Sequence, residues 1–565
     1  MKRPNILLMM VDEMRYPPSY ETDEIKKWRE KYLTAQNRLK KKGVTFTNHH
    51  TASLACAPAR ASLFTGQYPS LHGVSQTDGA AKSAYDPNMF WLVPNTVPDM
   101  GDYFKKMGYK TLYKGKWHIS AADILIPGTK NAMASYNNNG TVNQKNTDIY
   151  TKANKLEEFG FSGWVGPEPQ GINPLNSGSS SSQKVNGRDI FYVEEVIELL
   201  NNVSDMDEPW LMVASLVNPH DITLYGEVTN KMPIYNFEIE SSVPHIPAAP
   251  SSNDDLTTKP QCQSSYKNLY QQGFQPTIDT EKYRQLYYSL NLTADRNINK
   301  ILQALDKNNL TENTIVIFTS DHGDFIGAHG LFQKWYTAYQ EAIHVPLIIQ
   351  LPKKMYPDIR GTQIDQLTSH IDILPTILGL VNADTYRIQK QLKKSFTDVH
   401  PLVGRDLTTL IYGYKKIPEP ILFTTDDNVL FGNNMISITG TPYQPIIQPA
   451  SIQTVIVQLE QNQIWKFSRY YDNSNFWTVP NTSSIIQQNT NSVQNNDIII
   501  NTSTTKNKTN AAPDEYELYC LSTDPIEMIN YANPKYATEK TKKIEAKLRC
   551  LLDKLVAEKC IVPNK

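Results

Sequence analysis

Residues 6–13 read ILLMMVDE, six consecutive apolar side chains that run directly into two acidic ones. A strand in a parallel sheet is covered on both faces, so its sequence is apolar without the alternation of a half-exposed strand. A secretory signal has a longer apolar segment and is not followed at once by acidic residues. The stretch therefore predicts the first core strand of an α/β sheet, with Asp12 and Glu13 at its carboxyl end.

Strands and helices are predicted to alternate along the larger, N-terminal part of the chain. Thr96-Val97-Pro98 opens a helical pattern that ends at Gly108, and residues 191–200 and 298–305 also keep helical spacing. Further apolar strand runs lie between these patterns, at residues 109–114, 210–217, 314–319 and 345–349. This repeated strand–helix–strand order predicts an α/β fold with a doubly wound, mostly parallel sheet flanked by helices.

The character of the sequence changes near residue 415. Shorter alternating runs at residues 454–459 and 464–467 are typical of a small antiparallel sheet. An apolar stripe at helical spacing over residues 544–555 predicts a closing helix. The chain is long for one domain, so we expect a large α/β catalytic domain over residues 1–415 and a smaller C-terminal α+β subdomain over residues 416–565.

The bulk composition argues against several classes of protein. The 56 Lys and Arg residues balance the 57 Asp and Glu residues, so the overall charge predicts no nucleic-acid or anionic-membrane partner. No stretch approaches the ~20 apolar residues of a membrane span. With no signal peptide predicted either, we expect a cytoplasmic protein. The five cysteines contain no CxxC pair, which fits neither a disulfide framework nor a zinc site.

Charged side chains and histidines follow the ends of four predicted strands. They are Asp12 and Glu13, Lys116 and His118, His220, and Asp321 and His322, with Lys334 shortly beyond. Ligands of open parallel sheets bind beyond the carboxyl ends of the strands, so we expect these groups to share one edge. Carboxylates with an imidazole hold divalent cations, and Lys and His groups neutralise an oxyanion. Each residue alone also fits a polar turn or a structural histidine, but packing does not explain the whole set.

The segment Cys56-Ala57-Pro58-Ala59-Arg60, continuing to Thr65-Gly66, carries the most specific pattern. It resembles the motif Cys-x-Pro-x-Arg followed by Thr-Gly of the sulfatase family, whose members have an alkaline-phosphatase-like α/β fold. In that family the cysteine is oxidised to formylglycine. One hydroxyl of the hydrated aldehyde attacks sulfur, and the other expels sulfate from the covalent intermediate. A buried cysteine acting as a small apolar residue is the alternative interpretation.

The resemblance extends over nearly the whole chain. Further stretches similar to the family's motifs are Pro4-Asn5-Ile6-Leu7-Leu8 before Asp12, Gly115-Lys116-Trp117-His118, Thr319-Ser320-Asp321-His322-Gly323, Lys334 with residues 345–348, Glu517-Leu518-Tyr519, and residues 524–527. Their shared order along the chain is more specific than any one of them. The resemblance therefore implies the activity of a sulfuric ester hydrolase, which cleaves a sulfate monoester into an alcohol and sulfate.

The resemblance also implies a role for each candidate residue. The metal ligands would be Asp12, Glu13, Asp321, His322 and an oxygen of the modified Cys56. Arg60 would stabilise the hydrated aldehyde, while Lys116 and His118 would hold its hydroxyls and the sulfate. His220 would give a proton to the leaving oxygen, and Lys334 would bind a sulfate oxygen. A divalent metal lowers the pKa of the hydroxyl and draws charge from the sulfuryl oxygens.

Two departures from the family pattern bear on the metal. Many relatives have Asp where this chain has Glu13, and many have Asn where it has His322. Imidazole suits Ca²⁺ poorly and Mn²⁺ or Zn²⁺ better. We expect calcium first and manganese next. An Asp-His-Gly-Asp segment like that at residues 321–324 also occurs in the choline-sulfatase and phosphonate-monoesterase branch.

Three functions stay open from the sequence. The first is hydrolysis of a small or glycan-type sulfate ester, which requires a maturation enzyme that converts the cysteine into formylglycine. The second is a phosphodiesterase or phosphonate monoester hydrolase with the same site, and the third is a non-catalytic protein that retains the fold. The alcohol half of the substrate should be selected by loops around residues 121–184 and 221–275, which show no recognisable code.

Overall fold

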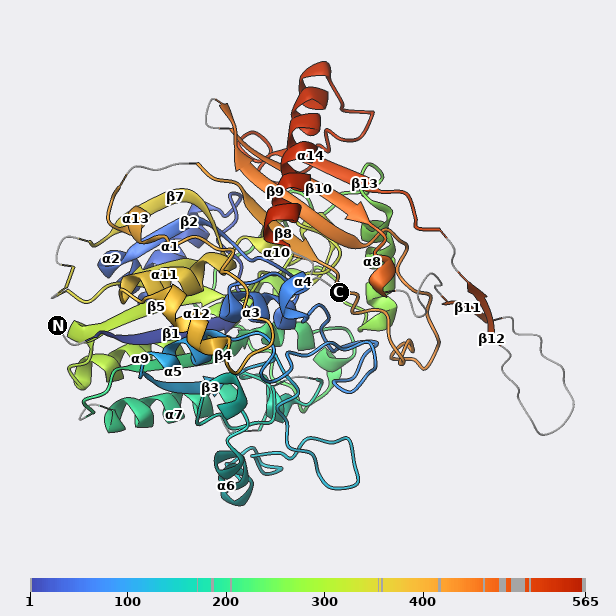
Figure 1. Ribbon diagram of the computed structural model, residues 1–565. Helices are drawn as coiled ribbons and strands as arrows, with labels where there is room; N and C mark the ends of the chain where they lie inside the picture. Colours follow the sequence, from blue (N-terminus) through green and yellow to red (C-terminus); the bar gives the residue numbers. More distant parts are fainter. Residues whose placement is uncertain are drawn as a thin grey trace, which may run out of the picture.

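A computed structural model of the 565-residue chain describes residues 3–169, 171–183, 187–203, 206–353, 355–356, 359–414, 418–460, 463–476, 484–488, 503–507 and 510–560. Its main element is a seven-stranded sheet with the strand order β3-β4-β1-β5-β6-β2-β7 (Figure 1). The strands are β1 (Asn5–Asp12), β2 (Val44–His50), β3 (Lys110–Gly115), β4 (Trp210–Pro219), β5 (Thr314–Ser320), β6 (Leu347–Gln350) and β7 (Thr362–Ser369). Only the two pairs made by β6 are antiparallel, so the prediction of a mostly parallel sheet is confirmed.

Alternate residues of β1 enter two different cores, and this explains the unbroken apolar sequence. One core takes Ile6, Leu8 and Met10, and the core on the opposite face takes Leu7, Met9 and Val11. None of the six side chains is more than 1% exposed. Burying an aliphatic side chain of this size contributes about 1.5–3 kcal/mol. Both faces of the central strand therefore require apolar residues, and β1 is fixed between β4 and β5.

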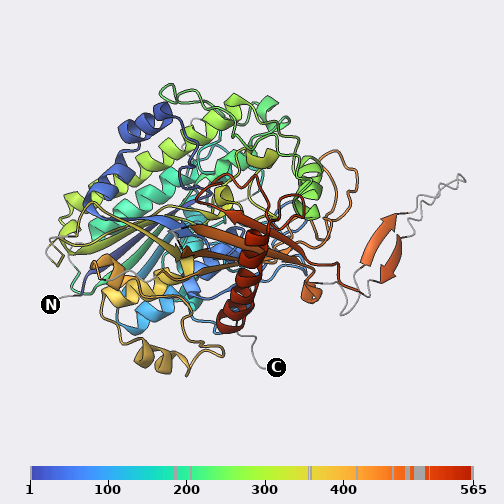
Figure 2. The same ribbon diagram turned by 90° about the horizontal axis from the view of Figure 1, so that it is seen from above.

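Helices cover both faces of the large sheet, as the strand–helix alternation predicts. The helices that pack on the core of Leu7 are α2 (Thr34–Lys42), α7 (Arg188–Asn202) and α9 (Glu281–Lys307). Those that pack on the core of Ile6 are α3 (Cys56–Thr65), α5 (Met100–Lys106), α11 (Ile373–Leu380) and α12 (Thr385–Leu392). Figure 2 shows the green helices on one side of the sheet and the yellow and light-blue helices on the other.

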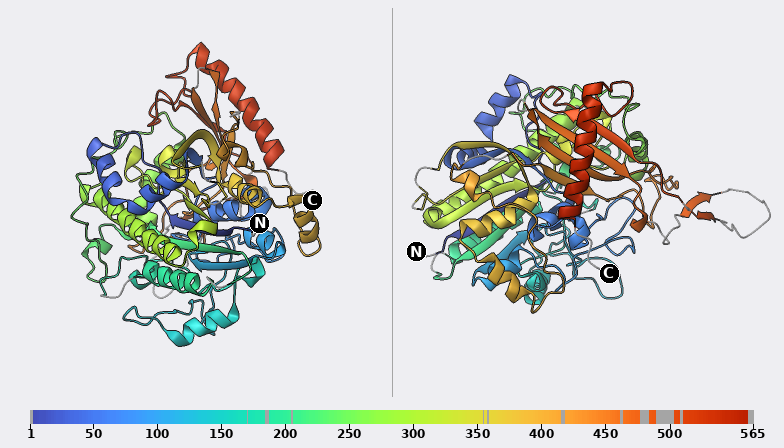
Figure 3. Two further views of the ribbon diagram at one scale, coloured as in Figure 1. Left: turned by 90° about the vertical axis from the view of Figure 1, so that its left-hand side faces the viewer. Right: turned by 45° about the horizontal axis from the view of Figure 1, so that its top comes forward.

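The C-terminal part forms the predicted antiparallel sheet and closing helix. Its strand order is β13-β10-β9-β8, from β8 (Ile421–Thr425), β9 (Ser451–Gln458), β10 (Ile464–Tyr471) and β13 (Glu515–Cys520). Helix α14 (Glu539–Lys559) packs against these strands through Leu548, Leu552 and Leu555 (Figure 3). A separate two-stranded pair joins β11 (Ser484–Gln488) and β12 (Ser503–Asn507). The predicted boundary between residues 415 and 416 lies outside the described residues, so the division into two domains stays a prediction.

Several helices differ from the sequence-based expectation. Helix α5 begins at Met100 rather than near Thr96, because Asp99 caps it and exchanges hydrogen bonds with Asp102. The stretches expected as loops contain α6 (Gln144–Ala153) and α8 (Gln261–Gly273). The remaining α-helices are α1 (Asp23–Tyr32), α4 (Pro69–His72), α10 (Gln340–Ile343) and α13 (Thr408–Ile411). Within the described ranges, none of the helices has the length and apolar character that crossing a bilayer requires.

Candidate active site

Four neighbouring strands bring the predicted site residues to one edge of the sheet. Asp12 ends β1, and Asp321 follows β5, whose Ser320 lies opposite Val11. Lys116 follows β3, and His220 opens a 3₁₀ helix directly after β4. Since β3, β4, β1 and β5 are adjacent and parallel, their carboxyl ends coincide. The expectation of a shared edge is confirmed for the groups that these four strands carry.

A glycine permits the close turn that delivers Lys116. Gly115 has a backbone φ of +99°, and a Cβ atom placed on it would lie 1.8 Å from the carbonyl oxygen of Ser215. The next residue donates its backbone N–H to that same carbonyl at 3.0 Å. Any larger residue would push β3 away from β4 and displace Lys116 from the site.

Helix α3 presents Cys56 as its first residue. All ten residues of the helix are buried, which is why its sequence shows no polar face. Gly66 ends the helix with a left-handed φ of +64°. Inside it, Ser62 donates to the carbonyl of Pro58 at 2.8 Å and lies 3.0 Å from Nε2 of His72. These contacts fix the helix beneath the strand ends, so the position of Cys56 follows from packing.

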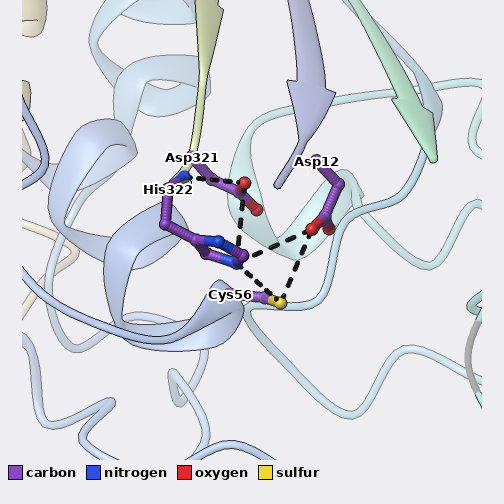
Figure 4. A group of neighbouring side chains, drawn as sticks. All are labelled: Asp12, Cys56, Asp321 and His322. Atoms are coloured by element: carbon purple, nitrogen blue, oxygen red, sulfur yellow. Dashed lines mark hydrogen bonds and ion pairs between the residues drawn. The ribbon is translucent and has the colours of Figure 1, made fainter. Parts of the chain in front are cut away.

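Four potential ligand atoms converge around Cys56 (Figure 4). Its Sγ atom lies 3.1 Å from Nε2 of His322 and 3.7 Å from Oδ1 of Asp12. Nε2 of His322 is in turn 3.6 Å from Oδ1 of Asp12 and 3.7 Å from Oδ1 of Asp321. One donor atom from each of these four residues lies within 4.8 Å of all the others, and every residue is buried. A single cation therefore fits between them.

Arg60 occupies the other carboxylate oxygens. Its NH2 group lies 3.1 Å from Oδ2 of Asp12, and its Nε atom lies 2.8 Å from Oδ2 of Asp321. NH1 donates to the carbonyl of Lys116 at 2.7 Å and to the hydroxyl of Ser215 at 2.9 Å. The fork of Arg60 thus holds both carboxylates so that their Oδ1 atoms face Cys56.

Two lysines and His220 also lie close to the carboxylates. Nζ of Lys116 is 2.6 Å from Oδ2 of Asp12, and Nζ of Lys334 is 3.2 Å from Oε2 of Glu13. Nε2 of His220 is 3.9 Å from the same oxygen of Glu13. Asp12, Glu13 and His220 form a second group of potential ligands. The Glu13 carboxylate thus points toward Lys334 and His220, and its role as a metal ligand stays a prediction.

His118 contacts a residue that the sequence did not single out. Its Nε2 atom lies 2.6 Å from Oδ1 of Asp78, and both side chains are nearly buried. Glu168 holds the backbone at this point by accepting N–H groups from Trp117 and His118, at 3.2 and 2.8 Å. Nothing in the local pattern around residue 78 reveals this contact, because the two partners are 40 residues apart.

Burial and neighbouring charges together shift the pKa values of the site. Burial would raise the pKa of Asp12, but Lys116 and further cations lower it well below the usual range. Burial raises the pKa of Glu13 despite Lys334. Burial lowers the pKa of His220, and Lys116 lowers it further, so its imidazole is neutral without substrate. Burial would lower the pKa of His118, but Asp78 raises it. Such opposed shifts are typical of catalytic sites.

The loop that carries Lys334 depends on the C-terminal part of the chain. Trp335 donates its indole N–H to Oδ2 of Asp427 at 2.8 Å, and Oδ1 of Asp427 accepts the N–H of Thr77 at 3.0 Å. Lys466 donates to the carbonyl of Ala338 in the same loop. Asp427 therefore links the segment next to Asp78 with the segment next to Lys334, a role the sequence did not indicate.

Comparisons with known proteins show which family the chain belongs to. Residues 4–383 match the family model described as Sulfatase. The chain belongs to the sulfatase family. An uncharacterised sulfatase of Escherichia coli K12, YidJ, is 30% identical to it over 391 residues, which cover 68% of this chain and 69% of that protein. The choline-sulfatase of Rhizobium meliloti is 26% identical over 438 residues, covering 74% and 73%.

A solved structure shows that the fold is shared more widely. The phosphonate monoester hydrolase of Agrobacterium radiobacter has a TM-score of 0.57 with this sulfatase at 18% identity, over 98% of this chain and 96% of that one. At this identity the likeness concerns the fold. The family match makes this sulfatase a sulfuric ester hydrolase, and the roles of its individual site residues stay predictions.

The donor set of this sulfatase fits a divalent metal ion. Nδ1 of His322 lies 3.0 Å from the carbonyl of Gly323, so it carries the proton and leaves the lone pair of Nε2 directed at the cluster. Burial lowers the pKa of His322, which keeps the imidazole neutral, as a ligand must be. Asp12 and Asp321 add one carboxylate oxygen each, and Oδ1 of Asp321 also accepts the backbone N–H groups of Glu13 and His322, at 3.1 and 2.9 Å.

Proposed function

We propose that this protein hydrolyses a sulfate monoester to an alcohol and sulfate, through a formylglycine made from Cys56 and with one divalent metal ion. The observation that carries the proposal is the position of Cys56. It begins a buried helix and faces Asp12 and His322, the same cluster that Lys116 and Arg60 enter from the other side. A hydrated aldehyde at this residue would supply the two hydroxyl groups that the reaction needs.

Asp12, Asp321, His322 and an oxygen on residue 56 would hold the metal, with Glu13 as a further carboxylate nearby. The metal would add positive charge beside the sulfuryl oxygens. Oxygen donors suit calcium, whereas the His322 imidazole favours manganese. We propose calcium as the native ion and manganese as the alternative. Arg60 then acts by holding Asp12 and Asp321 in place as well as by its charge.

The side chains around this cluster can bind an anion and move a proton. Lys116 and Lys334 bring two ammonium groups, each more than 98% buried, where a charge interaction is stronger than in water. A bound sulfate ester adds negative charge beside His220 and thereby raises its pKa toward the protonated form. His220 can then donate that proton to the leaving alcohol oxygen.

The alcohol half of the substrate would occupy the cavity beside Asp78. This cavity has a volume of about 530 Å³, and its wall includes Asp78, Lys82, Tyr85, Asp123, Lys130 and Asn131. Mixed charges and amides of this kind suit a small polar or glycan-type alcohol. A second cavity of about 400 Å³ contains Tyr16 and His344 but none of the predicted site residues.

Hydrolysis of a phosphorus ester is the second candidate function. It is favoured by the fold shared with a phosphonate monoester hydrolase and by the Asp321-His322-Gly323-Asp324 segment. Paired rates on an aryl sulfate, an aryl phosphate diester and an aryl phosphonate separate the two. A larger kcat/KM for the sulfate supports the first proposal, and a larger value for either phosphorus ester replaces it with the second.

The nucleophile is tested by mass spectrometry of the peptide that contains Cys56, from protein isolated from its native host. We expect the mass of formylglycine at this position, which requires a maturation enzyme as a partner. A cysteine left unmodified in every molecule would overturn the mechanism. It would leave a metal-dependent esterase of another kind or a non-catalytic protein.

A further inference from the structure

Asp78 and His118 form a carboxylate–imidazole pair at the rim of the site. Oδ1 of Asp78 lies 2.6 Å from Nε2 of His118, with side-chain exposures of 8% and 4%. At this distance Nε2 must carry a proton that it donates to the carboxylate. The other ring nitrogen, Nδ1, is enclosed and has no hydrogen-bond partner among the described residues.

Nδ1 is the ring nitrogen of His118 that remains available to interact with residue 56. The Cys56 side chain is a neighbour of the His118 ring that contributes to raising its pKa, and Nε2 already donates to Asp78. His118 also has a backbone φ of +57°, an uncommon conformation for a residue with a Cβ. Glu168 stabilises this turn through two backbone N–H groups. The backbone and the ring of His118 are thus held by two separate carboxylates.

We propose that Asp78 is a positioning residue that fixes the tautomer of His118, so that the Nδ1 lone pair faces residue 56. This inference rests on the proposed function and adds a member to its site. Asp78 does not touch the reacting atoms. It acts through His118, because accepting the Nε2 proton leaves only Nδ1 free to take another.

The step that needs this arrangement is the release of sulfate from residue 56. The C–O bond to the sulfate breaks, and its electron pair leaves with the sulfate. The electron pair of the remaining O–H bond forms the C=O bond, and the proton moves to Nδ1 of His118. Without Asp78 the imidazole is free to place its proton on Nδ1, and that tautomer accepts nothing from residue 56.

The test compares Asp78→Asn with Asp123→Asn, two neutral variants of the same shape as the wild type. Both aspartates line the 530 Å³ cavity, but only Asp78 touches His118. Asp123 instead accepts the backbone N–H of Glu168 at 2.8 Å. For each variant, kcat and KM on an aryl sulfate are measured, together with metal content and the fraction of modified residue 56.

We expect Asp78→Asn to lower kcat by about 10²- to 10⁴-fold, the usual contribution of a positioned acid or base, with little change in KM. Asp123→Asn should change mainly KM, because its amide oxygen can still accept the N–H of Glu168 while the charge of the cavity wall changes. A fall in kcat that is equal in both variants would show that charge in the cavity, and not the tautomer, is responsible. That result would overturn the proposal.

A second readout does not depend on catalysis. In protein labelled with ¹⁵N-histidine, an imidazole N–H bonded to a carboxylate gives a proton resonance far downfield, which His118→Gln assigns. We expect this signal from Nε2 in the wild type and in Asp123→Asn, and its loss in Asp78→Asn. Its absence from the wild type would refute the pairing even if Asp78→Asn failed to fold. If sulfate esters proved not to be substrates, the proposed function would be wrong. The same resonance would still show whether Asp78 fixes the tautomer of His118.

Discussion

Replacing Arg60 with methionine removes the charge that links the two central carboxylates. Arg60 and its partners Asp12 and Asp321 all have side chains that are 0% exposed, and the ion-pair distances are 3.1 and 2.8 Å. Methionine fills much of the same volume but leaves both carboxylates without this partner. Losing one partner of a buried ion pair typically costs about 3–5 kcal/mol, since the remaining charge stays desolvated. That is a large part of the roughly 5–15 kcal/mol by which proteins are usually stable.

The matched control is Arg38→Met, at a pair near the surface. Arg38 lies 2.8 Å from Asp306, with side-chain exposures of 18% and 45%, so the bond length matches while the burial does not. A pair of this kind typically contributes about 0–1 kcal/mol. Free energies of unfolding from urea denaturation, measured in chelator, give both costs. Repeating the measurement with the metal should reduce the cost of Arg60→Met, because the ion supplies positive charge to the same carboxylates.

Equal costs for the two variants would refute this reasoning. They would mean that Asp12 and Asp321 accept protons or water when Arg60 is absent, so that the site is less closed than its burial indicates. A cost for Arg60→Met that did not respond to the metal would contradict the placement of the ion between these carboxylates.

Three further predictions concern the metal, the helix that carries Cys56 and the loop of Lys334. Removing the metal with a chelator should abolish activity and lower the unfolding free energy, by about 2.7 kcal/mol relative to metal at a hundred times its dissociation constant. Burial lowers the pKa of His72 to about 3, so His72 stays neutral in the folded protein when the pH falls below the usual value near 6.5. The unfolded chain then takes up a proton that the folded protein does not, and the unfolding free energy decreases. Between pH 7 and pH 5, the unfolding free energy of His72→Gln should therefore decrease by about 2 kcal/mol less than that of the wild type. Asp427→Ala should cost about 3–5 kcal/mol and raise KM, since it leaves the buried Lys82 ammonium with only neutral partners and the indole N–H of Trp335 unpaired.

Each of these three predictions has an outcome that would contradict it. Full activity in metal-free protein would show that the reaction needs no metal. Reactivation by manganese but not by calcium would show that manganese is the native ion. The same fall in stability between pH 7 and pH 5 in the wild type and in His72→Gln would show that His72 is not the group titrated. A wild-type KM in Asp427→Ala would show that the loop of Lys334 does not depend on its link to the C-terminal sheet.

The sequence predicted the parts of the fold that depend on local patterns. The unbroken apolar run of β1 follows from burial on both faces, and the acidic pair after it follows from the carboxyl end of a parallel strand. The stripe in α14 likewise predicted a helix packed on one side. By contrast, the Thr-x-Pro pattern predicts a helix that begins near Thr96, whereas the capping box of Asp99 and Asp102 starts α5 at Met100.

The residues that hold the site in place were not predictable, for a physical reason. Asp78 meets His118 across 40 residues, and Asp427 meets Trp335 across 92. Neither aspartate lies in a periodic stretch or at the end of a predicted strand, so nothing local distinguishes it from an exposed loop carboxylate. Their roles become visible only when the chain is folded and the partners are close.

The link through Asp427 limits how freely this enzyme can be recombined with its relatives. The family match ends at residue 383, and every predicted ligand and catalytic group lies before that point. Asp427 and Lys466, which anchor the loop after Lys334, lie beyond it. A chimera that joined residues 1–383 to the tail of another family member would inherit the complete catalytic signature. It would work only if the foreign tail carried equivalent anchors, so compatibility is decided by residues outside the signature.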